Sequence, residues 1–420
     1  MFDPKTEPRK TIYLGALSLA LANLQMMVFN SYLVLYLELD LLTAILVISV
    51  IVSLRNFLQL FFRVPLGELS QVVGRKPLVL FGHFGYALSL GLLGLADHWL
   101  LAGLATALFA IAMSAYWPAL FSYVGDVSQD RFGVNNGRVF QGGDFGMIVG
   151  SFVVTVLLDY VSFSLSTLFI LTCVFGLLAA LLIWVVLPET LNSSAREPFE
   201  GFVSFFTSSF LSMVRRIILI TRTPGMLPIY GLQLVIAFTE FMFTSFYPVL
   251  VVSLGFSKGT VSFIAMAGTL VLVWFKPKLG ELTDRFGFKQ PIFLSLFLTA
   301  CAFALLPLTG YLATYSLLGQ VVLYIVVMGS LITAYTGVNG GTAKTAPSNK
   351  RGLALGTLGF YVSMGRTTST LALGPVWEVF SIGWVFGVTS FLLVAVVLVF
   401  FLILRKKRKP MLERSNLPLL

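Results

Sequence analysis

The chain contains one ten-residue pattern twice, as GELSQVVGRK at residues 67–76 and as GELTDRFGFK at residues 280–289. Two basic residues ahead of the copies, Arg63 and Lys276, are separated by the same offset as Gly67 and Gly280. A repeat at half the length of the chain is far longer than the repeats of solenoid proteins. It predicts two halves that are built on one plan.

Apolar residues fill most of the sequence around these patterns. Of the 420 residues, 57% are hydrophobic and 11% are charged, and the mean hydropathy is +0.93, which excludes an ordinary soluble protein. Runs long enough to cross about 30 Å of hydrocarbon recur along the chain, and they are too uniformly apolar for the strands of a barrel. The sequence therefore predicts an all-α membrane protein with twelve transmembrane helices, at roughly 11–37, 43–64, 77–96, 99–123, 136–159, 164–187, 226–251, 257–276, 291–311, 314–338, 352–376 and 380–404.

A second correspondence supports the duplication of this membrane domain. Gly137 and Gly150 match Gly352 and Gly365 at one shared offset, which is close to the offset of the first pattern. We therefore expect two parallel six-helix halves that are related by an axis along the membrane normal.

The basic residues lie almost entirely on one side of the predicted spans. With a cytoplasmic N-terminus, 25 of the 28 Lys and Arg residues fall in cytoplasmic segments, Arg55 and Arg366 fall inside helices, and Lys258 alone lies outside. This distribution follows the positive-inside rule and places both termini in the cytoplasm. It also explains the net charge of +10 without any nucleic-acid partner.

These assignments divide the chain into four parts. Residues 1–190 form the N-terminal half, residues 191–225 a cytoplasmic linker, residues 226–404 the C-terminal half, and residues 405–420 a basic cytoplasmic tail. Aromatic and apolar residues recur at helical spacing in the linker, ahead of several arginines, and predict an amphipathic helix in the membrane interface.

The duplicated pattern resembles the signature loop of the major facilitator superfamily, which joins the second and third helices and recurs between the eighth and ninth. The C-terminal copy keeps the Asp and Arg of that signature as Asp284 and Arg285, whereas the N-terminal copy has Gln71 and Val72 instead. Further similarity lies in Pro188-Glu189-Thr190 after the sixth span. The resemblance implies the twelve-helix fold of that family and solute transport by alternating access.

The two loops are candidate gating elements. Their glycines permit close helix approach and chain reversal, and Asp284 could cap a helix or pair with a nearby cation. Such contacts could hold one end of the transporter closed, although a loop that only orients the hairpin is the alternative. The predicted gating residues are Gly67, Gly74, Arg75, Lys76, Gly280, Asp284, Arg285, Gly287 and Lys289.

Charged residues inside the bilayer are the main candidates for the transport site, because each is costly unless it faces a cavity or a partner. Arg55, Asp144, Glu240 and Arg366 all fall near the middle of their predicted spans. Asp144 or Glu240 could carry a proton, and an arginine could tune that carboxyl group or receive an anion. Buried structural ion pairs are the alternative interpretation. Weaker polar candidates for the same cavity are Gln59, Gln233 and Tyr324.

The sequence favours a secondary active transporter and not an enzyme. We expect proton-coupled efflux of a small, partly apolar compound, with uptake or exchange of an organic anion or a sugar as the alternative. A non-transporting receptor or assembly factor on the same scaffold is the alternative from another class. The proton gradient is the expected energy source, since the chain shows no phosphate-binding loop and no metal-binding spacing. We expect a monomer in the cell (inner or plasma) membrane, with a small molecule and lipid as its partners.

Overall fold

The computed structural model describes residues 7–128, 132–191, 201–308, 317–346 and 351–406, and within these ranges all regular structure is helical. Long helices form because the apolar runs must satisfy their backbone hydrogen bonds internally in a lipid environment. The N-terminal half comprises α1 (Pro8–Leu35) with a π-helical end (η1, Tyr36–Asp40), α2 (Ile45–Val73), α3 (Arg75–Gly94), α4 (Trp99–Ser128), α5 (Phe132–Thr155) with a second π-helical end (η3, Val156–Tyr160) and α6 (Leu165–Val186).

One further helix, α7 (Phe202–Thr221), separates this half from a second set of long helices. The second set comprises α8 (Met226–Ser253), α9 (Lys258–Phe286), α10 (Lys289–Leu308), α11 (Leu317–Thr345), α12 (Arg351–Val379) and α13 (Ile382–Lys406). Most of the predicted basic tail lies outside the described residues.

Eleven helices in the described parts of the chain are long and apolar enough to cross a membrane. The helix of the predicted twelve that does not qualify is α12, which is 29 residues long but carries Arg366 and many Ser and Thr residues. Several helices also extend beyond the predicted spans. In particular, α2 continues to Val73 and α9 to Phe286, about nine or ten residues past the predicted edges, because a helix need not end where the hydrocarbon ends.

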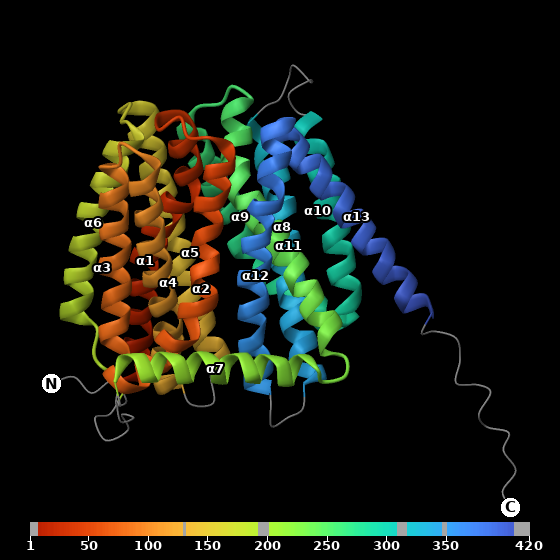
Figure 1. Ribbon diagram of the computed structural model, residues 1–420, viewed down its shortest axis with the longest axis horizontal. Helices are drawn as coiled ribbons and strands as arrows, with labels where there is room; N and C mark the ends of the chain where they lie inside the picture. The colour runs from red at the N-terminus through yellow and green to blue at the C-terminus, as the bar shows by residue number, and fades with distance from the viewer. Residues whose placement is uncertain (1–6, 129–131, 192–200, 309–316, 347–350, 407–420) are drawn as a thin grey trace, which may run out of the picture.

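The two halves stand side by side, and α7 lies across one end of both (Figure 1). Two pairs of helices make the principal contacts between the halves, α2 with α12 and α5 with α9. The aromatic face of α7 packs on α2, with ring centroids 5.5 Å apart for Phe210 and Phe61 and 5.8 Å apart for Phe206 and Phe62. The hydroxyl of Thr221 lies 3.1 Å from that of Tyr361 on α12. The linker helix therefore contacts both halves.

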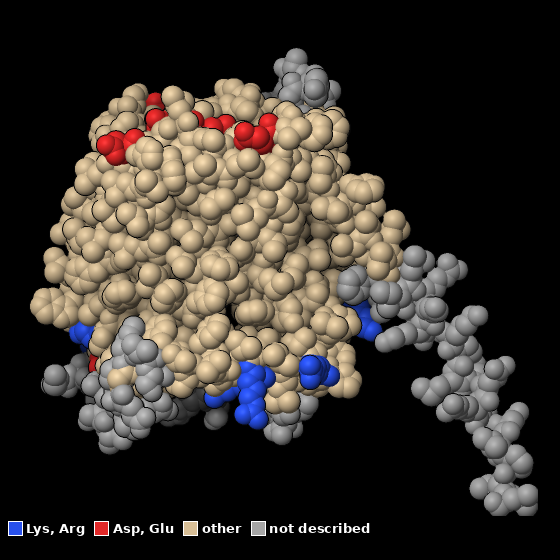
Figure 2. Space-filling model, in the orientation of Figure 1, with Lys and Arg blue, Asp and Glu red and all other residues tan. Residues whose placement is uncertain are grey.

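The ends of the molecule differ in charge (Figure 2). The end that carries α7, which we call the basic face, holds Arg75, Arg215 and Arg216, whereas Asp40 and Asp159 lie at the opposite end, the acidic face. This separation is the one that the positive-inside rule leads us to expect.

Glycines allow α1 and α5 to pack closely. A Cβ atom at Gly142, Gly146 or Gly150 would collide with Ala16, Ala20 or Leu24 of α1, respectively. Small residues four positions apart on one helix face are a common means of helix association in membranes, where van der Waals contact replaces the hydrophobic effect. The stripe fixes the rotation of α5 and directs Asp144 away from α1.

We expect Gly146→Ala to destabilise the protein by about 1–3 kcal/mol, because the new methyl group would overlap the backbone of Ala20. Gly137→Ala on the same helix is the matched control, since a Cβ atom at that position would have no neighbouring atom within 4 Å. Alanine there should be neutral or stabilise the helix by up to about 1 kcal/mol. The melting temperature of the purified variants, followed by tryptophan fluorescence, tests this difference; equal values would contradict the packing argument.

Candidate functional site

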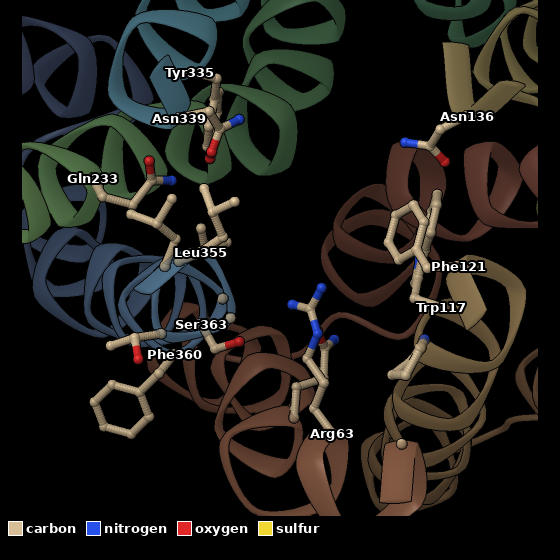
Figure 3. Close-up of a pocket in the computed structure, with 18 of the residues that line it drawn as sticks. Arg63, Trp117, Phe121, Asn136, Gln233, Tyr335, Asn339, Leu355, Phe360 and Ser363 are labelled. Carbon is tan, nitrogen blue, oxygen red and sulfur yellow. The ribbon is translucent and has the colours of Figure 1, made fainter. Parts of the chain in front are cut away.

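A cavity of about 1890 Å³ lies between the two halves. Its wall includes Gly67, Glu68 and Gln71 at the end of α2 and Arg216 of α7, all near the basic face. The cavity therefore extends to the basic face. Figure 3 shows the open space with helices of both halves around it, and the side chain of Arg63 projecting into it.

Contacts between the halves close the acidic face. The Tyr32 hydroxyl on α1 donates to the Lys258 carbonyl at 3.1 Å and lies 2.5 Å from the Ser262 hydroxyl on α9. Asp159 accepts from the Ser257 hydroxyl at 2.8 Å and from the Gly259 amide at 3.0 Å, at the first turn of α9. These hydrogen bonds join the halves, so the cavity is accessible from one end only.

Glu240 on α8 and Arg366 on α12 form a bidentate ion pair. The guanidinium of Arg366 donates to both carboxylate oxygens at 2.8–3.0 Å, and the Tyr335 hydroxyl donates to Oε2 at 3.0 Å. Both charged side chains are about one-fifth exposed. The arrangement stays within the C-terminal half, and Arg366 and Tyr335 line the cavity.

Asp144 on α5 pairs with Lys276 on α9, across the boundary between the halves. The ammonium nitrogen of Lys276 lies 2.7 and 2.5 Å from the two carboxylate oxygens, and both residues line the cavity. The predicted eighth span ends at Lys276, so the sequence analysis counted this residue as cytoplasmic. The extension of α9 brings it alongside the cavity instead.

Arg55 lies behind the cavity wall and is only 6% exposed. Its Nη1 donates to the side-chain oxygen of Asn30, and its guanidinium carbon lies 4.7 Å from the centre of the Phe241 ring on α8. Arg55 interacts electrostatically with both Glu240 and Arg366. It thus adds a second positive charge beside one carboxylate.

Arg63 lies two turns farther along α2 and lines the cavity. The sequence analysis counted it among the cytoplasmic residues and did not select it as a site residue. Within the described parts of the chain, no carboxylate pairs with Arg63, and Arg366 is the charged group that acts on it. Two like charges from opposite halves therefore line the same cavity.

The polar candidates are divided between the cavity and the core. Gln59 and Gln233 line the cavity, and the side-chain oxygen of Gln233 is buried without a hydrogen-bond partner among the described residues. Tyr324 is instead buried in the C-terminal half beside Gly268, with its ring 5.7 Å from Phe243 and 5.9 Å from Tyr247. The structure places Tyr324 outside the wall of the cavity, because the face of α11 that carries it packs toward α8 and α9.

The N-terminal signature loop is organised around Arg75, which is 4% exposed. Its guanidinium donates to Asp126 at 3.2 Å, to the Ser70 hydroxyl at 2.7 Å and to the side-chain oxygen of Gln71 at 2.9 Å. Gln71, which replaces the family's Asp, thus still accepts a hydrogen bond, while Asp126 of α4 supplies the negative charge. Gly67 allows this approach, since a Cβ there would lie 3.1 Å from Pro118 on α4.

Glu189 completes the loop by capping α3. Its two carboxylate oxygens accept from the backbone amides of Arg75 and Lys76 at 3.0 and 3.2 Å, the first amides of the helix. An anion is stabilised at this position by the helix dipole. Gly74 has a φ of 108°, which permits the sharp break between α2 and α3. The whole network lies within the N-terminal half.

The C-terminal loop has the same turn, with a φ of 72° at Gly287. Arg285 is exposed, and the ammonium of Lys289 lies 5.9 Å from the centre of the Phe288 ring. The side chain of Asp284 lies outside the described residues, and so do the surroundings of Gly280. The role of Asp284 as a latch therefore stays a prediction.

A helical membrane protein whose two six-helix sets enclose one central cavity, closed at one end, has the architecture of a transporter and not of an enzyme. The chain belongs to the Major Facilitator Superfamily, whose sequence profile matches residues 15–232 and again residues 229–418. A search of curated protein sequences finds no match.

Solved structures of transporters share the fold. A POT family transporter in complex with 5-aminolevulinic acid is 12% identical, with a TM-score of 0.73 over 95% of this chain and 96% of that one. The nucleoside transporter NupG is 15% identical, with a TM-score of 0.71 over 92% and 99%. The human organic anion transporter MFSD10 is 16% identical, with a TM-score of 0.63 over 93% and 98%. At these identities the likeness concerns the fold alone.

Asp126→Asn should lower stability by about 1–3 kcal/mol, since it removes the charge that Arg75 and the Thr190 hydroxyl share at Asp126. The control is Glu7→Gln, which removes an exposed pair with Lys10 that should contribute less than about 1 kcal/mol. Thermal melting of both variants in detergent measures the contrast. A loss of similar size in the control would contradict a special role for Asp126.

Glu240→Gln should cost about 3 kcal/mol or more, because it leaves the charge of Arg366 without its bidentate partner. Arg366→Gln should be similarly costly, and the double variant should lose clearly less than the sum, since both residues act as one pair. A thermal-melting double-mutant cycle measures this coupling. Strict additivity would show that the pair does not stabilise the fold.

Proposed function

We propose that this chain is a secondary transporter that moves a small organic anion across the membrane by alternating access. The observation that carries the proposal is the excess of cations around the cavity. Its wall includes five basic residues and two acidic ones: Arg63, Arg138, Arg216, Lys276 and Arg366, against Glu68 and Asp144.

Ion pairing leaves part of this positive charge available. Lys276 pairs with Asp144, Arg366 with Glu240, and Arg216 lies 3.5 Å from Glu68 at the basic face. Arg63 and Arg138 keep no acidic partner among the described residues. An isolated cation in an apolar surrounding is costly, and an anionic substrate would compensate it.

The carboxylates support this choice over a proton-carrying one. Asp144 and Glu240, the two candidates for proton transfer, are each held by a basic residue at 2.5–3.0 Å. Each carboxylate therefore already has a basic partner and takes part in holding two helices together. Proton-coupled efflux of a partly apolar compound is the second candidate, favoured by the aromatic wall that Trp117, Phe121 and Phe140 contribute.

The charges also suggest how the substrate would drive the conformational change. Arg63 belongs to the N-terminal half and has no acidic partner among the described residues, so closing the C-terminal half over it would bury an uncompensated charge. An anion bound to Arg63 would remove this cost, so that the halves close around substrate. The proposal takes the basic face as the cytoplasmic one, as the positive-inside rule leads us to expect in a cell membrane, and on that assignment the structure is the inward-facing state.

Transport can be tested with purified protein in proteoliposomes, following electrogenic currents and internal pH on addition of benzoate, succinate, their amides and a lipophilic cation. We expect currents with the acids but not with the amides. Arg55→Gln should reduce the current about tenfold, because it lowers the positive charge beside the cavity. Arg9→Gln, which changes an exposed residue at the start of α1, is the control and should leave it unchanged.

The other outcomes discriminate the alternatives. Proton movement with the lipophilic cation alone would support the efflux candidate. Stoichiometric binding without flux of any compound would support a receptor.

A further inference from the structure

The duplicated halves allow each residue of one interface to be compared with its counterpart in the other. Arg63 of α2 corresponds to Lys276 of α9 at the offset that relates the two signature loops. Asp144 of α5 corresponds to Gly359 of α12 at the offset that relates the glycines on either side of them in the two helices. Because α5 packs on α9 and α2 packs on α12, the two interfaces between the halves are equivalent.

One interface contains a complete ion pair. The carboxylate of Asp144 lies against the ammonium of Lys276, with nitrogen to oxygen distances of 2.7 and 2.5 Å. The position of Asp144 on α5 therefore faces the cation on α9.

The equivalent interface has the cation without the carboxylate. A Cβ atom built on Gly359 would lie 3.5 Å from Nη1 and 3.6 Å from Cζ of Arg63. Gly359 thus faces the guanidinium as Asp144 faces Lys276, but it contributes no side chain. Both Arg63 and Gly359 line the cavity, so the space beside them is open to a ligand.

We propose that a carboxylate group of the substrate binds Arg63 in the space beside Gly359 and takes the place that the carboxylate of Asp144 holds at Lys276. The inference rests on the proposed anion transport and adds the location and chemistry of the charged subsite. A guanidinium offers two parallel donors to a carboxylate, which an ammonium does not. Arginine therefore suits a carboxylate that arrives from solution and is held by a charge-assisted pair of hydrogen bonds.

The surroundings indicate what the rest of the substrate is like. On α12, Ser363 lies one turn after Gly359 and also lines the cavity, where its hydroxyl can donate to the same carboxylate. Across the space stand Trp117 and Phe121 of α4 (Figure 3), with ring centroids 5.6 Å apart. These rings fit an aromatic or otherwise apolar body. The site therefore selects an apolar monocarboxylate over a sugar or a cation.

The test uses phenylglyoxal, which modifies accessible arginines, with the extent at Arg63 read by peptide mass spectrometry of the purified full chain. Benzoate should slow the modification of Arg63 about tenfold, and benzamide, which has the same shape without the charge, should not. Equal protection by the two compounds, or no protection by benzoate or phenylacetate, would overturn the proposal.

A substitution at Gly359 tests the equivalence of the interfaces. Gly359→Asp should supply the missing carboxylate, slow the modification of Arg63 about tenfold without any ligand, and abolish further protection by benzoate. Gly359→Asn has the same size without the charge and should leave Arg63 several-fold more reactive than Gly359→Asp does. Undiminished benzoate protection in Gly359→Asp would contradict the subsite.

Failure of this subsite and failure of the proposed function are distinguishable. Currents with organic acids but no protection of Arg63 would keep anion transport and overturn the subsite. Protection of Arg63 without currents would support the subsite and contradict the proposed transport.

Discussion

Compensation of charge inside an apolar molecule is the constraint on which this structure depends. Arg366 and Lys276 line the cavity between apolar helices, and each is held by a carboxylate from a neighbouring helix. Because Lys276 and its partner belong to different halves, compensation also helps to define how the halves meet. Compensation is incomplete at Arg55 and Arg63. These positions are therefore the candidates for an interaction with substrate.

Close packing supplies the rigidity that such pairs require. The glycine stripe of α5 brings it against the backbone of α1, and this contact sets the direction in which Asp144 points. Arg75 and Glu189 fix the turn between α2 and α3 in a similar way, through hydrogen bonds confined to one half. Each half can therefore move as a unit, and the contacts that must exchange are those between the halves, such as the pair of Tyr32 and Ser262.

Sequence reasoning predicted the all-α membrane fold, because the long apolar runs and the duplication are properties of the chain alone. It also selected Asp144, Glu240 and Arg366, since a charge within a long apolar run needs an explanation wherever it points. It could not predict which charges meet, because partners across α5 and α9 depend on helix rotation and on the register between helices. It misjudged the surroundings of Arg63 for a related reason: hydropathy marks the edge of the hydrocarbon, whereas α2 continues beyond that edge along the cavity.

The comparison of the halves explains why duplication by itself would not create a binding site. Two identical halves would repeat the pair of Asp144 and Lys276 at both interfaces, and each cation would then carry its own counterion. Replacing one of these carboxylates by Gly359 removes a charge and a side chain at the same point, so that a positive potential and an open volume arise together. The equivalent loops differ as well, since Gln71 occupies the position of Asp284, and there Asp126 restores the missing charge from another helix. Among the described residues, no carboxylate from another helix compensates Arg63 in this way. The loop around Arg75 therefore stabilises one half, whereas the cavity beside Arg63 can bind an anion.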